Sequence, residues 1–433
     1  MDAAFGQTAP PGQANLDVPS AAFQAPTPSL RALPVESAAG TSDSAPTSGN
    51  SQIGSPTDAS TIRKFYTFAV GLRAVYDTNY GTTNSGNSGQ YGTSIVASVL
   101  LDHEFPEDSI TASYTFTGTY FLDETSSSNQ AGSDTQSLDL THTLLAKDTH
   151  TFSERTVLSL AEQLTYGVEP DIYDNVGTPF NNGSHLTNQF SSSLTYQYTP
   201  RVGFSAGYSN IISRYDDQIV GDDQNSVQQS ASGSINYSVA PKVSLSLGGM
   251  LDQIEYETAD RGYVDFTGFG GAQWQVNPGL SVSGRAGATF FHPEVGEDTI
   301  IPYAGLSIGW SPGPRTHLQA NYSHEVTPSS QAGAQAQVSD LLSANAMYTF
   351  NSKFSANIQA SLLMSNVSQT SSDSTAAGVS NDETDYFMGP SLVYHYNSYL
   401  DFDTGITYSG NTSDLSDRTY QRLEAYIGIR GTY

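Results

Sequence analysis

The stretch LEAYIGIRGTY, residues 423–433, decides how the rest of the chain is interpreted. Counted back from the last residue, every second position is apolar or glycine: Tyr433, Gly431, Ile429, Ile427, Ala425 and Leu423. The positions between them are mostly polar, small or charged. Because successive side chains of a strand point to opposite faces, this two-residue period predicts a terminal β-strand with one apolar and one polar face.

Composition limits the classes of protein that fit. The 433 residues are 37% hydrophobic, which is low for a large globular core, yet 26 Tyr and 19 Phe are too many for a wholly disordered chain. A formal net charge of −27 argues against nucleic-acid binding, which needs Lys and Arg on phosphate. Cysteine is absent, so disulfides and thiolate metal sites are excluded. No run of about 18 apolar residues predicts a transmembrane helix.

Residues 1–62 have a different composition from the rest, rich in Pro, Ala, Ser, Gly and Thr. Such a segment buries too little apolar area to offset its ordering entropy, so we expect a disordered leader, with a short plug or an ordered strand as the alternative. The start MDAAFGQTAPPGQ lacks the basic and apolar regions of a signal peptide. We expect that start to be truncated or processed, and residues 63–433 to form the second domain.

The two-residue period recurs from residue 65 onward. In FYTFAVGLRAVYD, residues 65–77, Tyr66, Phe68, Val70 and Leu72 share one face. The same alternation is found in residues 109–122, 202–212, 243–251, 264–276 and 354–364. In SERTVLSLAEQLTYG and SLDLTHTLLAK this phase points Glu162 and His142 to the apolar face, unless a bulge re-aims them.

The connections between these segments alternate between two kinds. Tight ones carry the Pro, Gly or Asn of turns: 105–108, 147–150, 199–201, 240–242, 277–279, 311–314, 351–353 and 396–399. Longer polar ones occupy 78–92, 123–134, 167–186, 216–226, 257–263, 293–300, 327–337, 367–383 and 409–418. They divide the chain into about 18 strands of roughly 11–14 residues, longer than the usual strands of soluble sandwiches or propellers.

This pattern favours an all-β transmembrane antiparallel barrel with short turns on one side and long loops on the other. Every backbone N–H and C=O in hydrocarbon must be paired, so the last strand is expected to pair with the first. An even strand count puts both termini on the short-turn, periplasmic side. Aromatic residues just before the short turns, such as Tyr196, Trp274, Trp310 and Tyr396, would form the girdle at that interface.

Two segments resemble a known class of protein. The closing stretch, with Ile427, Ile429 and Tyr433 and with Gly428 counted on the apolar face, resembles the C-terminal signal that the outer-membrane barrel assembly machinery recognises. The first strand, GLRAVYDTNY at residues 71–80, resembles that of outer-membrane β-barrel porins linked to exopolysaccharide genes. The resemblance implies a Gram-negative outer-membrane barrel with the assembly machinery, lipid and small hydrophilic solutes as partners. It names no solute and leaves a homo-oligomer open.

Charged residues of the polar face gather where the barrel would close. Asp401 and Asp403 begin the penultimate strand, Arg422, Glu424 and Arg430 lie on the last, and Arg73 lies on the first. Neighbouring strands allow these charges to pair, so they form either a ladder that fixes the seam or a charged strip along the pore. Other candidates for the inner face are Asp102, Glu104, Asp139, Arg285 and Glu325.

The loop at 167–186 is the longest and carries Glu169, Asp171 and Asp174. It would either fold inward as an acidic constriction or remain an exposed acidic loop. Acids in further loops, including Asp382, Glu383 and Asp385, would give the outer mouth a negative field that concentrates cations and could hold Ca²⁺. No other cofactor and no resident metal is expected.

The sequence contains no convincing catalytic set. GLSIG, residues 305–309, matches G-x-S-x-G, but Ser307 falls inside a predicted strand and not in a strand–turn–helix elbow. We therefore predict a protein that is not an enzyme: an outer-membrane channel for passive diffusion of small hydrophilic solutes or ions, leaning towards cations. The alternative is a plugged or structural barrel that serves a polysaccharide-export or secretion assembly.

Overall fold

The structure is a computed structural model. It describes residues 65–79, 89–121, 138–167, 184–216, 224–257, 261–329, 335–368, 380–414 and 418–433. The leader predicted at residues 1–62 lies outside the described residues. No helix in these described ranges is long and apolar enough to cross a membrane.

The described residues form strands of 12 to 18 residues. The first nine are β1 Tyr66–Asp77, β2 Gln90–Glu104, β3 Asp108–Phe121, β4 Leu138–Ser153, β5 Thr156–Gly167, β6 His185–Gln197, β7 Val202–Tyr215, β8 Ser226–Ala240 and β9 Val243–Tyr256. The others are β10 Tyr263–Asn277, β11 Leu280–Pro293, β12 Thr299–Gly313, β13 Thr316–Pro328, β14 Ala336–Asn351, β15 Phe354–Ser368, β16 Ser380–Asn397, β17 Leu400–Ser413 and β18 Tyr420–Thr432.

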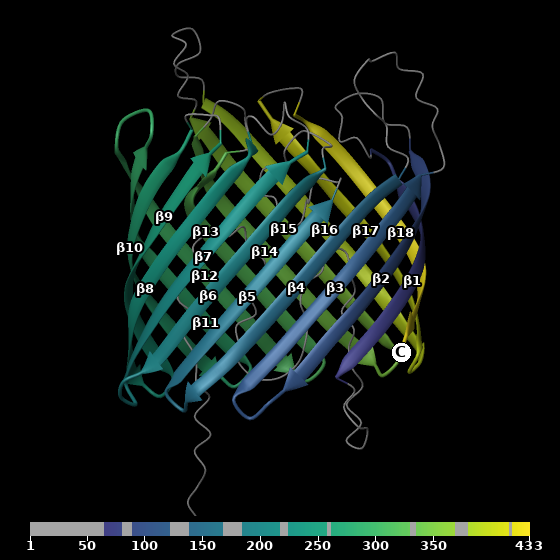
Figure 1. Ribbon diagram of the computed structural model, residues 1–433, viewed down its shortest axis with the longest axis horizontal. Helices are drawn as coiled ribbons and strands as arrows, with labels where there is room; N and C mark the ends of the chain where they lie inside the picture. The colour runs from purple at the N-terminus through teal and green to yellow at the C-terminus, as the bar shows by residue number, and fades with distance from the viewer. Residues whose placement is uncertain are drawn as a thin grey trace, which may run out of the picture.

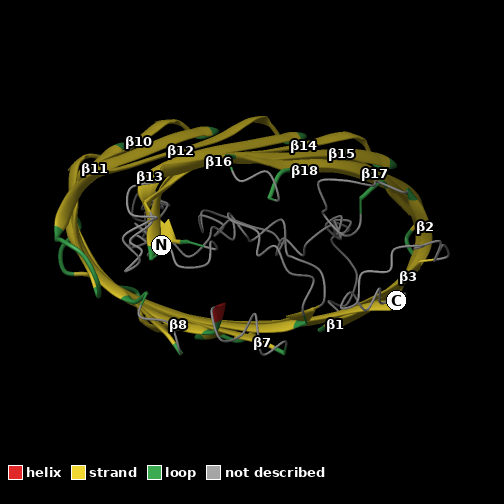
Figure 2. Cartoon of the chain, turned by 90° about the horizontal axis from the view of Figure 1, so that it is seen from above, coloured by secondary structure: helices red, strands yellow, loops and turns green. Residues whose placement is uncertain are grey.

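These strands make one closed 18-stranded antiparallel sheet, as the sequence predicted. Each strand pairs with the next along the chain, and β1 pairs with β18 from Ala69–Thr432 to Asp77–Glu424. The tilted strands, the short turns at the lower end and the C-terminus beside them are visible in Figure 1. Seen from above, the barrel has an oval outline (Figure 2). Closure gives every described strand a partner on each side along at least part of its length, as crossing a hydrocarbon layer requires.

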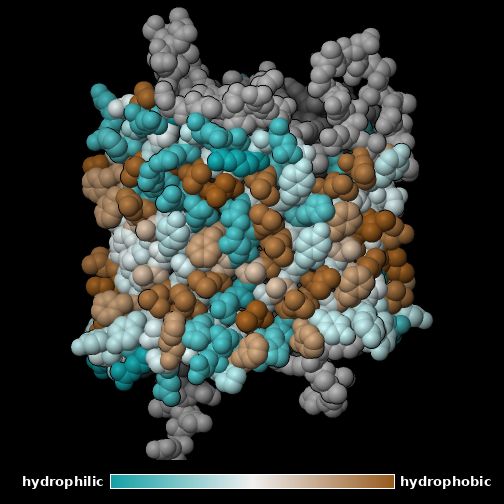
Figure 3. Space-filling model, in the orientation of Figure 1, coloured by the Kyte–Doolittle hydropathy of each residue, from teal (hydrophilic) through white to brown (hydrophobic). Residues whose placement is uncertain are grey.

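The alternation of side chains sorts every strand into two faces. On β1, Phe68, Val70 and Leu72 are 45%, 41% and 51% exposed on the outside, while Ala69 between them is buried on the inner face. The space-filling view shows hydrophobic side chains over much of the outer surface, interrupted by hydrophilic patches and bordered by hydrophilic ends (Figure 3). Aromatic residues next to the short turns are exposed on this surface, among them Tyr196, Tyr198, Trp274, Trp310, Tyr348, Phe350 and Tyr396.

The strands reach further than the sequence suggested. The expected loop at 327–337 is shortened because β13 extends to Pro328 and β14 begins at Ala336. In the same way β16 begins at Ser380 and β17 extends to Ser413, inside the loops expected at 367–383 and 409–418. Polar residues in these stretches resemble loop composition, yet their backbone groups are paired with neighbouring strands.

The wall divides at one place. β12 and β13 pair only from Ala304–His324 down to Gly313–Thr316 within the described residues. Above that point β12 pairs with β11 alone, and its Pro302, which has no N–H to donate, lies in this half-paired stretch. The outer end of β13 keeps only its pairing with β14, which runs from Thr316–Tyr348 up to Pro328–Ala336. In Figure 2 the strand labelled β13 runs inside the barrel outline.

Candidate functional site

The seam where the barrel closes is bridged on its inner face by Arg73 of β1. Arg73 and Asp403 of β17 both lie opposite Gly428 of β18, so the arginine has to cross the middle strand to reach the acid. It donates from Nε and Nη2 to Asp403 Oδ2 at 2.9 Å and 2.6 Å. Its guanidinium also lies 4.4 Å from the ring centre of Tyr426. A single side chain therefore ties three strands together.

A second bridge lies nearer the short turns. Arg430 of β18 is the direct partner of Asp401 on β17, and its Nη2 donates to Asp401 Oδ2 at 2.8 Å. His395 of β16 approaches the same carboxylate, with 2.8 Å between its Nδ1 and Asp401 Oδ1. The sequence grouped Arg430 with Asp401, whereas His395 was missed. Only the register shows that His395 is the direct partner of Asp401.

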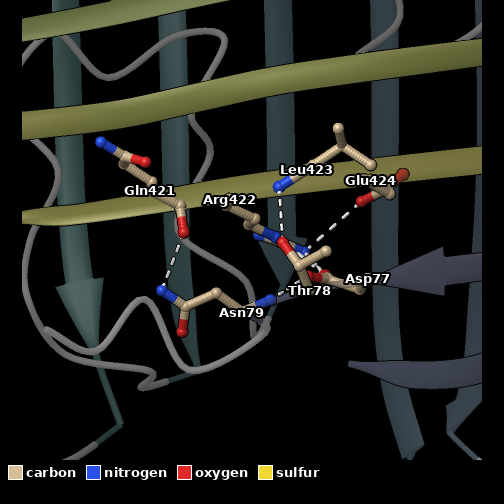
Figure 4. A network of polar contacts seen from close by, with 7 residues as sticks. All are labelled: Asp77, Thr78, Asn79, Gln421, Arg422, Leu423 and Glu424. Atoms are coloured by element: carbon tan, nitrogen blue, oxygen red, sulfur yellow. Dashed lines mark hydrogen bonds and ion pairs between the residues drawn. The ribbon is translucent and has the colours of Figure 1, made fainter. Parts of the chain in front are cut away.

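A third bridge lies towards the long-loop end and is drawn in Figure 4. Arg422 of β18 donates from Nε and Nη2 to Asp77 Oδ2 of β1 at 2.8 Å and 2.5 Å. Arg422 Nη2 also lies 3.4 Å from Glu424 Oε2. Asp77 is 0% exposed, and its Oδ1 accepts from the Asn79 backbone N–H at 2.8 Å. The sequence placed Arg422 and Glu424 here but missed Asp77, which shares a strand face with Arg73 and was therefore open to detection by its phase.

The backbone continues this network. The Asn79 side-chain amide donates to the Gln421 carbonyl at 3.0 Å, and the Leu423 N–H donates to the Thr78 hydroxyl at 2.8 Å (Figure 4). These contacts extend the β1–β18 pairing beyond Asp77, its last paired residue on β1. Ion pairs and hydrogen bonds to the backbone therefore both join β1 to β18 at this end of the seam.

The acids Asp382, Glu383 and Asp385, predicted for the outer loops, lie within β16 of the wall instead. Glu383 lies within β16, is 1% exposed and binds Arg418, whose Nε is 2.5 Å from Glu383 Oε1. It is therefore neutralised and contributes little to a negative field at the outer mouth. The expectation was wrong for Glu383 because the paired strand reaches further out than the polar composition indicated.

The remaining predicted site residues divide into two groups. Arg285 lies on the inner face of β11, away from the seam, with its guanidinium 5.6 Å from the Phe269 ring centre. It also donates a hydrogen bond to the Tyr303 hydroxyl. The proposed constriction acids Glu169, Asp171 and Asp174 lie outside the described residues.

The predicted assembly residues divide between the two faces. Ile427, Ile429 and Tyr433 are 66%, 40% and 65% exposed on the outer surface. Gly428 is buried on the inner face, so its assignment to the apolar face was wrong. A Cβ at Gly428 would lie 2.6 Å from Arg73 Cγ and 2.8 Å from Asp403 Oδ1. Glycine is needed there because the Arg73 bridge passes over that position.

Glu162 and His142 remain on the outward-facing phase, since the register of β4 with β5 shifts only beside the turn at Thr151–Ser153. Each has a polar partner within the wall. Asn188 Nδ2 donates to Glu162 Oε1 at 2.5 Å, and the Tyr114 hydroxyl lies 2.8 Å from His142 Nδ1. No bulge re-aims them in this part of the wall.

The inner face of the barrel is polar and mostly uncharged. Much of it is Ser, Thr, Asn and Gln, and the seam arginines are paired with acids. Across the described residues, no group of three or more His, Cys, Asp or Glu could hold a metal ion. Ser307 lies in β12 and donates to Asn321 Oδ1 at 2.8 Å, with no nucleophile elbow around it.

A closed barrel of paired strands, with an apolar outer surface between aromatic residues and a polar interior, defines a transmembrane β-barrel of the outer-membrane type. Residues 68–433 match the family described as "Putative beta-barrel porin 2". The chain belongs to this porin family, and it is an outer-membrane protein that contacts membrane lipid. Family and fold indicate a channel and not an enzyme.

Solved outer-membrane proteins resemble the chain at low identity. OpdK of Pseudomonas aeruginosa is 10% identical with a TM-score of 0.44, over 85% of this chain and 99% of that one. OccAB4 of Acinetobacter baumannii is 11% identical with a TM-score of 0.40, over 86% and 98%. The FrpB iron transporter of Neisseria meningitidis is 10% identical with a TM-score of 0.43, over 86% and 82%. No curated protein matches the chain.

Proposed function

We propose that the protein is a passive diffusion channel of the outer membrane for small hydrophilic solutes and ions, with a preference for cations. The observation that carries this proposal is the closed 18-stranded barrel whose inner face is lined by hydroxyl and amide side chains. Such a lining replaces part of the water around a solute without binding it tightly. Solutes then cross down their own gradient.

The cation preference is supported by the balance of charge on the inner face. Arg73, Arg418, Arg422 and Arg430 are each paired with an acid, so the seam adds little positive potential. Away from the seam, the inward-pointing positions of the strands hold more acids than bases: Asp102, Glu104, Asp139, Asp252, Asp265 and Glu325 against Lys147 and Arg285. A passage with excess carboxylate raises the local concentration of cations.

The purified, folded protein in a planar lipid bilayer tests the proposal. We expect stepwise ion conductance and a reversal potential, across a KCl gradient, that gives a higher permeability for K⁺ than for Cl⁻. A folded barrel that inserts but carries no current would overturn the channel. A Cl⁻ permeability equal to or above that of K⁺ would retain the channel and remove the cation preference.

The seam charges and the termini belong to the same proposal. We infer that Arg73, Arg422 and Arg430 act mainly as a ladder that fixes the closing register, since each already has a carboxylate partner. The outward residues Ile427, Ile429 and Tyr433 would be read by the barrel assembly machinery, with both termini in the periplasm. In the plugged alternative, residues 1–62 would fill the lumen. A homo-oligomer would require an interface on the lipid-facing surface. Bound Ca²⁺ would require the acidic residues of the outer loops as ligands.

A further inference from the structure

Part of the wall lies inside the barrel. We define the inner tip as residues 325–329 and 335–339, the outer ends of β13 and β14 with their described flanks. Val326 and Ala336 of the tip form a buried apolar cluster with Ile254 of β9 and Tyr263 of β10. Partly buried Tyr256, Phe291 and Ile301 pack against it. Ile254 and Tyr263 lie on the inner face of their strands, so the tip covers the lumen side of β9 to β12.

The tip is held in this place by more than apolar contact. Arg261, between β9 and β10, is 4% exposed and donates from Nη2 to the Ser329 carbonyl at 2.7 Å. The same guanidinium lies 4.3 Å from the ring centre of Tyr256. Within the tip, the hydroxyl oxygens of Thr327 and Ser339 are 2.6 Å apart. A buried arginine bonded to a carbonyl would lose this partner if the tip moved outward, which disfavours that movement.

Glu325 of the tip is half-buried and lies where β13 leaves β12, one position beyond the last residue paired with that strand. This residue shares its phase with Asn321, whose side chain meets Ser307 on the inner face. Glu325 lies within electrostatic reach of Asp252 and Asp265, which face each other across β9 and β10. Asp252 Oδ1 accepts a hydrogen bond from Ser230, whereas Asp265 Oδ1 is buried without a hydrogen-bond partner among the described residues.

We propose that the inner tip is the constriction element of the channel, and that Glu325 is the residue that sets its charge preference. This inference rests on the proposed channel function. The tip narrows the passage because two strand ends occupy space inside the wall. In their ionised forms, the three carboxylates from the tip and the facing wall outweigh the guanidinium of Arg285, and the potential there then attracts cations and repels anions.

The first experiment changes the charge at the tip. Glu325→Gln keeps the size of the side chain, and we expect the K⁺/Cl⁻ permeability ratio at low salt to fall about twofold or more, because a narrow site amplifies a single charge. The matched control is Glu154→Gln, the same change at an exposed residue of the short turn between β4 and β5, outside the inner lining, and it should leave the ratio near that of the wild type. An unchanged ratio in Glu325→Gln, or an equal fall in the control, would overturn the role of Glu325.

The second experiment tests the placement of the tip and does not depend on any change at Glu325. The chain has no cysteine, so Ile254→Cys together with Ala336→Cys introduces the only two thiols. We expect mild oxidation to form a wall-to-tip disulfide, visible as a mobility shift of the denatured chain, with wild-type conductance retained. The control pair is Thr149→Cys with Ser159→Cys, direct partners on β4 and β5 whose hydroxyl oxygens are 3.4 Å apart.

A disulfide that fails to form while the control pair does, or one whose formation changes the conductance, would show that the tip is not in this place in the conducting state. Either result overturns the constriction. Failure of the channel function itself is recognised separately, because the wild-type protein would then carry no current while the disulfide still reports the position of the tip.

Discussion

Gly428 is the residue at which the closing seam is tightest. Its partners across the two neighbouring strands are Arg73 and Asp403, and the ion pair between them passes over it. The sequence interpretation counted Gly428 with the apolar, lipid-facing residues, although its position between Ile427 and Ile429 puts it on the opposite face of the strand. The need for glycine arises from the ion pair between Arg73 and Asp403, which lie 330 positions apart in the sequence and meet across this strand.

Adding a single methyl group at position 428 tests whether the Arg73–Asp403 ion pair requires glycine there. Gly428→Ala would place a Cβ against Arg73 Cγ and Asp403 Oδ1, so we expect the free energy of unfolding to fall by about 1–3 kcal/mol. Urea unfolding of the barrel in lipid vesicles measures it. The control is Gly431→Ala on the same strand, where the nearest atoms to a new Cβ are 3.9 Å away and little change is expected. Equal stability of the two variants would contradict the bridge.

β18 shows at the scale of an element why the last stretch of the chain matters. Its two-residue period predicted its two faces, the need to close the barrel predicted its pairing with the first strand, and the observed pairing with β1 confirms the latter. Tyr433 extends the pairing past the strand: its N–H donates to the Phe68 carbonyl at 2.8 Å, and its carbonyl accepts from the Phe68 N–H at 3.1 Å. The final residue thus completes the backbone pairing of the first strand.

Removal of Tyr433 tests the role of this element. The truncated chain loses two backbone hydrogen bonds and an exposed aromatic ring, so we expect several-fold less folded protein in the outer-membrane fraction. Each channel that does assemble should keep the wild-type K⁺/Cl⁻ ratio, since the ring faces outward. Tyr433→Phe retains the backbone and the ring and serves as the control. Normal assembly of the truncated chain would refute the assembly role.

β13 is the element for which sequence reasoning was incomplete. Its end was expected to be part of a loop at 327–337, because the stretch TPSSQAGAQAQ is long and polar. The structure shows that this end stays in a strand and keeps β14 as its neighbour, but separates from β12 and turns to the inside of the wall. Strand period indicates which residues share a face, but it does not tell whether that face meets lipid, water or another part of the same wall.

At the scale of the whole molecule, the proposed cation preference rests on the net charge of −27 and on the inward acids. We expect the K⁺/Cl⁻ permeability ratio to be highest in dilute KCl and to approach the ratio of the free-solution mobilities at high salt. The reason is that the screening length falls from about 10 Å at 0.1 M to about 3 Å at 1 M. Reversal potentials at several mean concentrations with a fixed gradient measure this. A ratio independent of salt would point to size, not charge, as the basis of selection.

The sequence by itself determined the fold class. Alternating side chains from residue 65 onward, and short turns that alternate with long connections, are local signals, because strand phase and turn chemistry depend on neighbouring residues. For the same reason it identified which charges share the inner face at the seam.

Only the tertiary structure decided which of those charges meet. Register fixes that Arg73 reaches Asp403 and that Arg422 reaches Asp77 across the first and last strands, 345 positions apart. It also decided that Glu383 is neutralised by Arg418, that His395 joins Asp401, and that β13 turns inside. These contacts follow from how the sheet closes on itself, and closure depends on the packing of all strands together and not on the residues of any one of them.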